Sequence, residues 1–167
     1  GLEVQIEDPT GLHALDLILA TSDRISEVTF GEGDFAAAAG MPAVDIGVAD
    51  EWDDAVPGDR WLLPRQQIVF AAARFGIRAI HGPYADFPDG EGFRRYARMS
   101  RALGFAGLWC IHPDQIAIAN EVFAPTSAEV ARAQAIIDQM DASRAEGSAA
   151  FHRSGIMADE ATIRMAR

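Results

Sequence analysis

The stretch ISEVTFGEGDFAAAAG, residues 25–40, decides the predicted fold. Its first six residues are rich in β-branched and aromatic side chains and predict a strand, and two glycines then mark a tight turn. The small residues 35–39 predict a helical turn that ends at Gly40. A strand that leads through glycines into a helix is typical of parallel α/β proteins, in which ligands bind at the carboxyl ends of the strands.

The same alternation of strand and helix recurs on both sides of this stretch. The four predicted strands are residues 4–6, 25–30, 77–80 and 105–111. The predicted helices are residues 12–20, 35–39, 64–75, 89–103, 114–122 and 126–144. Residues 41–60 lack clear periodicity and predict a loop. The fold class is therefore predicted to be α/β, with a parallel sheet.

The chain is predicted to have two parts. Residues 1–124 carry the four strands, which make about half of a (β/α)8 TIM barrel, because such a barrel takes about 250 residues. Residues 125–167 form a C-terminal helix followed by a lid or tail segment. Thr126 and Glu129 predict a capping box at the start of that helix, with the stripe Val130, Ala133, Ile137 and Met140 along one face.

Composition and charge exclude several classes of protein. The chain has 167 residues, and 25 acidic residues against 14 basic ones give a formal charge of −11, so we expect no nucleic-acid partner. No apolar run is long enough to span a membrane, and we expect no membrane partner. The single cysteine, Cys110, suits the reducing cytoplasm and is predicted to be a core residue inside its strand.

Every basic residue apart from histidine is an arginine, so the sequence contains no lysine. Schiff-base aldolase chemistry, pyridoxal phosphate anchoring and a P-loop each need a lysine amine and are excluded within this chain. Carbanion or enolate chemistry would therefore depend on a metal ion or on hydrogen-bond donors.

Two carboxylates stand at predicted strand ends. Glu7 and Asp34 each lie beside glycine or proline, and together they suit Mg²⁺, which commonly takes one or two protein carboxylates and keeps its other positions for water and substrate. The alternative is that both are helix N-caps or loop carboxylates. Gly31 and Gly33 offer backbone N–H groups to an anion or simply form a tight turn. A histidine that ends a strand, such as His81, is either an acid–base group or part of a hydrogen-bonded core.

Several stretches resemble the citrate lyase beta subunit-like (HpcH/HpaI aldolase) family, most closely its malyl-CoA lyase branch. They occur in the family's order and nearly from end to end: QIEDPTG from Gln5, FGEGDFAA from Phe30, AIHGPYADF from Ala79, LGFAGLWCIHP from Leu103, ANEVFAP from Ala119 and GIMADEATIRMA from Gly155. The resemblance implies that the chain is the second half of the barrel, beginning at the fifth strand. The first half of the family's barrel normally supplies an arginine for the substrate carboxylate.

The resemblance also implies site residues. By it, Mg²⁺ is held by Glu7 and Asp34, and substrate is bound by Gly33, Asp34, Pro83 and His112. Asp159 matches a C-terminal aspartate that acts as a catalytic acid–base group in a neighbouring subunit's site.

The implied activity is Mg²⁺-dependent carbon–carbon cleavage of a 3-hydroxyacyl-CoA thioester, of the malyl-CoA or citryl/citramalyl type. The products are an acyl-CoA thioester and a short oxo acid, and the implied assembly is a homo-oligomer. Two alternatives stay open: a truncated, catalytically incompetent oligomerising fragment of such a lyase, and a related malyl-CoA thioesterase.

Overall fold

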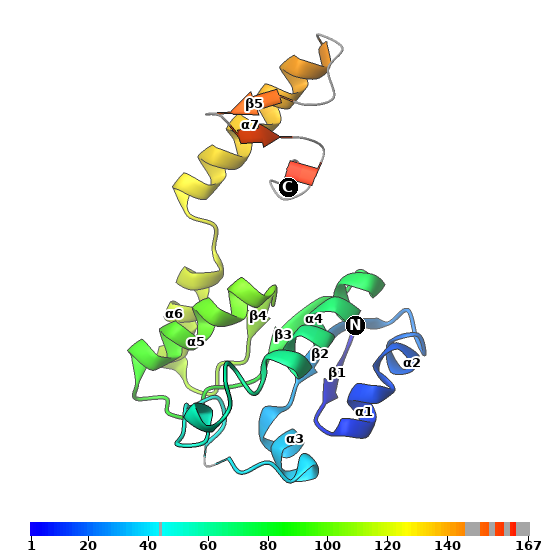
Figure 1. Cartoon of the computed structure of the whole chain (residues 1–167), viewed down its shortest axis with the longest axis vertical. Coiled ribbons are helices and arrows are strands. Elements are labelled where there is room, and N and C mark those ends of the chain that lie inside the picture. Colours follow the sequence, from blue (N-terminus) through cyan, green and yellow to red (C-terminus); the bar gives the residue numbers. More distant parts are fainter. Residues whose placement is uncertain (44, 146–150, 154–155, 159–160, 163–167) are drawn as a thin grey trace. The chain divides into compact units, whose positions relative to one another are not determined.

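The computed structural model describes the chain except for residues 44, 146–150, 154–155, 159–160 and 163–167. The chain divides into two compact units, Gly1–Phe123 and Ala124–Arg167 (Figure 1). No helix in the described ranges is both long enough and apolar enough to cross a membrane.

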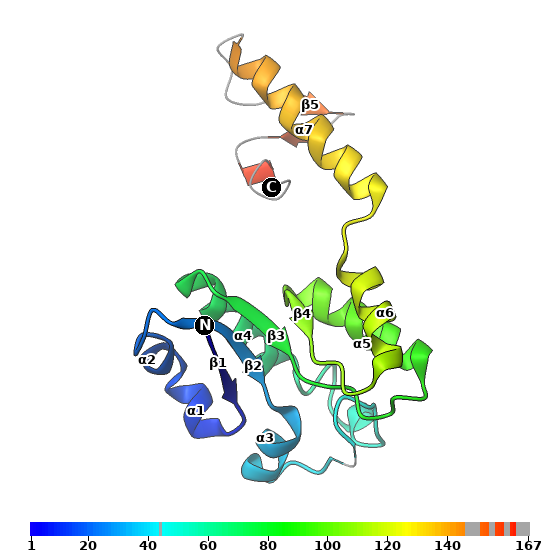
Figure 2. The same ribbon diagram turned by 180° about the vertical axis from the view of Figure 1, so that it is seen from behind.

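The first unit is built on a four-stranded sheet whose order follows the sequence. All three pairings are parallel, so the carboxyl ends of the strands lie at one edge of the sheet (Figure 2). This confirms the prediction of four parallel strands. The strands are β1 (Leu2–Ile6), β2 (Ile25–Phe30), β3 (Arg78–His81) and β4 (Gly107–Leu108).

The helices of this unit connect and flank the strands. They are α1 (Pro9–His13), α2 (Leu15–Leu19), α3 (Glu32–Ala39), the 3-10 turn η1 (Asp53–Ala55), α4 (Leu62–Phe75), α5 (Gly90–Leu103) and α6 (Pro113–Phe123). Two of the predicted helix ends are confirmed by their glycines: Gly76 has a φ of 66° after α4 and Gly104 has a φ of 102° after α5. Only glycine adopts that left-handed conformation without strain, so both helices stop there.

Two predicted elements differ from the structure. Residues 12–20 form parts of two short helices, because Asp8 caps α1 by accepting the Gly11 N–H at 2.8 Å and the chain bends at Ala14. The fourth strand is limited to Gly107–Leu108. Cys110 therefore lies outside it and is exposed, so the prediction of a core cysteine is wrong.

The sheet has two unlike faces. On one, which we call the helix-covered face, alternate strand residues such as Ile6, Val28 and Phe30 pack with Trp61 and Ile68 into the main core. The opposite, open face carries mostly polar side chains: Glu3, Gln5, Glu27, Thr29 and Arg78, together with Ile80.

A hydrogen bond across the open face shows that the sheet is curled. Trp109 follows β4, and its Nε1–H donates to Glu3 Oε1 on β1 at 2.9 Å, while Thr29 of β2 donates to the same oxygen. In a flat sheet β1 and β4 would be three strand spacings apart, about 14 Å. Joining these side chains requires the sheet to curve toward the open face, as the wall of a barrel does.

The second unit consists of α7 (Ser127–Ala145) and the antiparallel strands β5 (Phe151–Arg153) and β6 (Ile156–Ala158). The predicted capping box is confirmed, because Thr126 N–H donates to Glu129 Oε2 at 2.7 Å and Glu129 N–H donates to Thr126 Oγ1 at 3.1 Å. The predicted apolar face is wrong in part. Val130 is 53% exposed, and the buried residues are Ile136, Met140 and Ser143, so the buried stripe is rotated about the helix axis.

Candidate metal and substrate site

Glu7 lies at the carboxyl end of β1, opposite the start of α3. The register pairs Ile6 with Phe30, and the Gly31 N–H donates to the Ile6 carbonyl oxygen at 2.8 Å, so the ladder continues by one step. Alternation along the strands then directs Glu7 and Gly31 to the open face.

The Glu7 side chain lies directly against Gly31. A Cβ atom placed on Gly31 would lie 2.7 Å from Glu7 Cβ, 3.0 Å from Glu7 Oε2 and 2.8 Å from Gln5 Nε2. No side chain fits there unless Glu7 moves. The glycine is therefore required by this close approach, and it brings the Glu7 carboxylate to the residue that precedes α3.

Asp34 lies in the first turn of α3 and is exposed. The helix begins after Gly31, which has no side chain to cap it, so the first N–H groups of α3 lack a capping acceptor. Gly33 lies among them, and a Cβ there would come within 2.8 Å of the Ile46 side chain. The first turn of α3 thus carries both the Asp34 carboxylate and backbone N–H groups without a capping acceptor.

Neither Glu7 nor Asp34 makes a hydrogen bond or ion pair with another residue in the part of the chain that the structure describes. The structure does not support the alternative that both are helix caps, since Asp8 caps α1 and Gly31 precedes α3. The alternative that they are loop carboxylates stays open. Two unpaired carboxylates, one at the end of β1 and one in the first turn of the helix that follows β2, are a donor set that suits Mg²⁺. The described residues contain no group of three or more His, Cys, Asp or Glu side chains arranged for a metal, so a bound ion would complete its shell with water or substrate oxygens.

Pro83 and His112 lie in the loops that follow β3 and β4 at the same edge. Gly82 passes so close to β2 that a Cβ on it would lie 2.5 Å from the Phe30 carbonyl oxygen. The His112 ring stacks on Phe87 with centroids 4.5 Å apart. Its Nδ1 accepts the Asp114 N–H at 3.3 Å, which places the proton of the neutral ring on Nε2. Both loops therefore border the edge that carries Glu7.

Asp159, the predicted acid–base group, lies outside the described residues.

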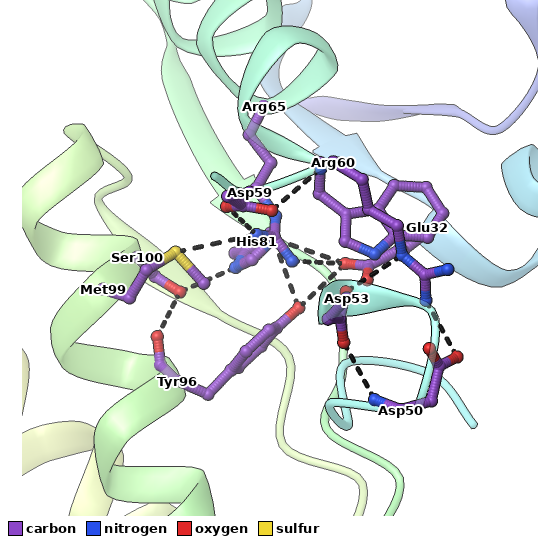
Figure 3. A network of polar contacts seen from close by, with 11 residues as sticks. Glu32, Asp50, Asp53, Asp59, Arg60, Arg65, His81, Tyr96, Met99 and Ser100 are labelled. Atoms are coloured by element: carbon purple, nitrogen blue, oxygen red, sulfur yellow. Dashed lines mark hydrogen bonds and ion pairs between the residues drawn. The ribbon is translucent and has the colours of Figure 1, made fainter. Parts of the chain in front are cut away.

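Sequence reasoning missed a buried ion pair in the same turn of α3. Glu32 is 4% exposed, and its Oε2 accepts from Arg65 Nη2 of α4 at 3.0 Å (Figure 3). Arg65 also donates to Asp59 Oδ2 at 2.7 Å and lies over the Tyr96 ring of α5. Three segments of the chain thus meet at the first residue of α3.

His81 extends this network into the core. Ser100 donates its hydroxyl proton to the Tyr96 carbonyl oxygen at 2.8 Å, so it accepts from His81 Nδ1 at 2.6 Å. The Tyr96 hydroxyl lies 3.2 Å from His81 Nε2 and 3.4 Å from Glu32 Oε2, so these two acceptors share its one proton (Figure 3). The ring is fully buried between Tyr96 and Phe105. The structure therefore agrees with the interpretation of a hydrogen-bonded core histidine.

Burial shifts the proton affinities of these groups. Desolvation raises the pKa of Glu32, although the Arg65 charge opposes that shift. Desolvation also raises the pKa of Tyr96 well above its ordinary value, and the Glu32 charge adds to the shift. Desolvation and the nearby Arg65 charge lower the pKa of His81 well below its ordinary value, which keeps the imidazole neutral.

A cavity of about 390 Å³ opens beside this network. Its polar lining includes Glu32, Asp59 and Arg65, which already pair with one another. None of the predicted site residues within the described ranges lines it. The cavity is thus separate from the candidate metal site.

Comparisons with known proteins identify the family. A sequence profile of the HpcH/HpaI aldolase/citrate lyase family matches residues 1–113. An L-malyl-CoA/beta-methylmalyl-CoA lyase from Rhodobacter capsulatus is 40% identical over 177 aligned residues, which cover 99% of this chain and 54% of that lyase. The human mitochondrial citramalyl-CoA lyase is 34% identical over 147 residues, covering 86% of this chain and 39% of that enzyme.

The fold is also similar to that of a solved structure. The CitE protein from Mycobacterium tuberculosis, in complex with magnesium, acetoacetate and coenzyme A, superposes with a TM-score of 0.76 at 28% identity and covers 97% of this chain and 57% of that one. The predicted α/β fold of the TIM-barrel type is confirmed. The chain spans about half the length of the curated relatives it matches.

Proposed function

Since the chain belongs to the HpcH/HpaI aldolase/citrate lyase family, we propose that its carboxyl-edge site takes part in Mg²⁺-dependent carbon–carbon cleavage of a 3-hydroxyacyl-CoA thioester of the malyl-CoA or citryl/citramalyl type. The products would be an acyl-CoA and a short oxo acid. The magnesium, acetoacetate and coenzyme A bound by the CitE relative support this class of ligand.

One observation carries the proposal: the Glu7 carboxylate lies against Gly31, at the start of the helix that carries Asp34, and neither acid has a partner among the described residues. A divalent cation that both carboxylates coordinate would be attracted by both negative charges. Glu7 and Asp34 are therefore the residues assigned to hold the ion. Bound there, Mg²⁺ would supply the positive charge that stabilises a developing oxyanion.

Other groups of the chain would bind the substrate and transfer protons. The uncapped N–H groups at Gly33 are positioned to receive a carboxylate or carbonyl oxygen of the oxo acid portion. Pro83 and His112 border the space where the thioester would lie. During cleavage the hydroxyl group loses a proton and becomes the carbonyl of the oxo acid, while the bond to the adjacent carbon breaks. The leaving carbanion equivalent is then protonated, and by resemblance Asp159 serves as the acid–base group.

The test is metal binding by the chain itself. We expect Mn²⁺, a paramagnetic substitute for Mg²⁺, to bind the wild-type chain and to be displaced by Mg²⁺ in electron paramagnetic resonance titrations. Glu7→Gln and Asp34→Asn should each weaken Mn²⁺ binding by at least about tenfold, because a carboxylate ligand becomes neutral.

Asp23→Asn is the matched control, since Asp23 is an exposed acid next to the amino end of β2, at the opposite edge of the sheet. It should leave the affinity unchanged. Equal affinities in the wild type, Asp34→Asn and Asp23→Asn would contradict the metal site.

A second candidate is a non-catalytic oligomerising chain. It is favoured by the edges of the sheet, because β1 and β4 each pair on one side only within the described residues, and unpaired strand edges promote association. Malyl-CoA cleavage assays on the chain, combined with sedimentation velocity, separate the two. Mg²⁺-dependent cleavage that is lost in Asp34→Asn supports the lyase, whereas a stable oligomer that binds the ion without turnover supports the second candidate.

A further inference from the structure

Gln115 is a buried polar residue in the first turn of α6. Its side chain is only 1% exposed, and the other buried residue of that helix is Val122, seven positions later on the same face. A carboxamide in such a position needs partners for both its oxygen and its nitrogen.

The oxygen of this carboxamide holds the loop after β4. Gln115 Oε1 accepts the Ile111 N–H at 2.8 Å and the His112 N–H at 3.2 Å. These two amides have no backbone acceptor, because β4 has ended and α6 has not begun. The Gln115 side chain therefore supplies the hydrogen-bond acceptor that a neighbouring strand would otherwise provide for these two N–H groups.

The nitrogen of the same carboxamide holds the loop after β3. Gln115 Nε2 donates to the Tyr84 carbonyl oxygen at 3.0 Å, one residue after Pro83. The two loops also touch through the stacked rings of Phe87 and His112. Exchanging the amide oxygen and nitrogen would place an NH₂ group against two N–H donors, so the partners themselves fix the orientation.

We propose that Gln115 is a positioning residue that couples the loops after β3 and β4 and thereby sets where Pro83 and His112 stand at the mouth of the site. The assignment of that mouth to substrate rests on the proposed function, whereas the coupling of the loops does not. Only a carboxamide performs both tasks: a carboxylate accepts from Ile111 and His112 without donating to Tyr84, and a thioether does neither.

Amide hydrogen exchange tests the coupling directly. In Gln115→Met we expect exchange at Ile111 and His112 to accelerate by at least about fivefold. Exchange should also accelerate at Ala85 in the loop after β3, whose N–H donates to the Ile46 carbonyl oxygen in the segment between α3 and η1. In Gln115→Glu, Ile111 and His112 should stay protected while Ala85 loses protection. Exchange at Val28 in the sheet should change in neither variant.

Gln66→Met is the matched control. Gln66 Nε2 also donates to a backbone carbonyl, that of Leu103, at 3.2 Å, but it joins α4 to the end of α5. It should leave the three loop amides unchanged. Unchanged exchange rates in Gln115→Met would overturn the proposal, because Gln115 would then be dispensable. An equal increase of the exchange rate at Val28 would also overturn it, because Gln115 would then stabilise the whole unit and not these two loops.

Ligand affinity tests the link to the site. With acetyl-CoA as the probe, at saturating Mg²⁺ and without an oxo acid, Gln115→Met should bind at least about fivefold more weakly than the wild type, and Gln66→Met should bind as tightly as the wild type. Equal affinity in Gln115→Met would overturn the positioning role. A wild-type chain that binds no acetyl-CoA would contradict the proposed function instead, and the exchange pattern would still decide whether Gln115 couples the loops.

Discussion

Two acidic residues in the first turn of α3 have opposite surroundings. Glu32 is buried and paired with Arg65, whereas Asp34 is exposed and has no partner among the described residues. Residues two positions apart on a helix point in nearly opposite directions, because each residue advances the helix by about 100°. One turn therefore presents one carboxylate to the core and another to solvent.

This difference separates two tasks. The buried pair ties the start of α3 to α4, and Asp59 adds a link to the loop before α4. The exposed Asp34 contributes no such contact and is free to bind a ligand. Substitutions in the buried group should therefore change stability, and substitutions around Glu7 and Asp34 should change metal binding.

The largest effect is expected for Arg65→Met. It leaves Glu32 buried without its cation, and breaking a buried pair in this way costs about 3–5 kcal/mol of unfolding free energy. Urea denaturation of the chain measures the cost. Arg74→Met, which removes the exposed pair with Asp16, should cost about 1 kcal/mol or less.

The double variant Glu32→Gln with Arg65→Met should recover much of that loss, because no buried charge then lacks a partner. Similar costs for Arg65→Met and Arg74→Met would show that the buried pair does not anchor α3.

A smaller effect is expected from pH. The pKa of His81 is well below its ordinary value in the folded chain, so below about pH 6.5 the unfolded chain binds a proton that the folded chain does not. Stability should therefore fall as the pH is lowered from 7.5 to 5.5, by at most about 1.4 kcal/mol per pH unit from this group.

His81→Gln should flatten that slope, and the difference between the wild type and this variant isolates the histidine. This comparison is needed because Glu32 gives a pH dependence of stability with the opposite sign. Its pKa is raised in the folded chain, so as the pH rises above about 4.5 the unfolded carboxyl loses its proton at a lower pH than the folded one, and the free energy of unfolding falls. Parallel slopes for the two proteins would contradict the neutral, buried His81.

The smallest effect is expected for Gly31→Ala. The added methyl group would lie 2.7 Å from Glu7 Cβ and should displace the Glu7 carboxylate, weakening Mn²⁺ binding by about fivefold, or about 1 kcal/mol. Gly107→Ala is the control, since its methyl group would meet only Ile80 Cδ1 at an ordinary 3.7 Å. Unchanged affinity in Gly31→Ala would mean that the position of Glu7 does not determine binding.

Much of the fold is predictable from local pattern. The capping box at Thr126 and the glycines that end α4 and α5 act within one turn of chain, and the structure confirms all of them. The fourth strand was predicted too long, because apolar residues continue past Leu108. Beyond the strand, the Ile111 and His112 N–H groups donate to Gln115, and local propensity does not reveal that contact.

The candidate site is also only partly visible in sequence. Glu7 and Asp34 stand out because each follows a strand pattern, and their roles remain predictions until metal binding is measured. Gln115 left a fainter signal: it occupies a position on α6 in line with Ile118, Ala119 and Val122, where an apolar residue would be expected. No sequence pattern reveals the buried pair of Glu32 and Arg65, because charged residues in helices are usually exposed.

By itself the sequence determined four strand–helix units, a chain without lysine, and acidic residues that follow two neighbouring strands. Only the tertiary structure decided which acid is buried, which amide joins the two loops and why Gly31 must lack a side chain. The physical reason is range: strand and helix patterns depend on neighbours within a few residues, whereas Glu32 and Arg65 are 33 positions apart and meet only after α3 and α4 have packed on the sheet.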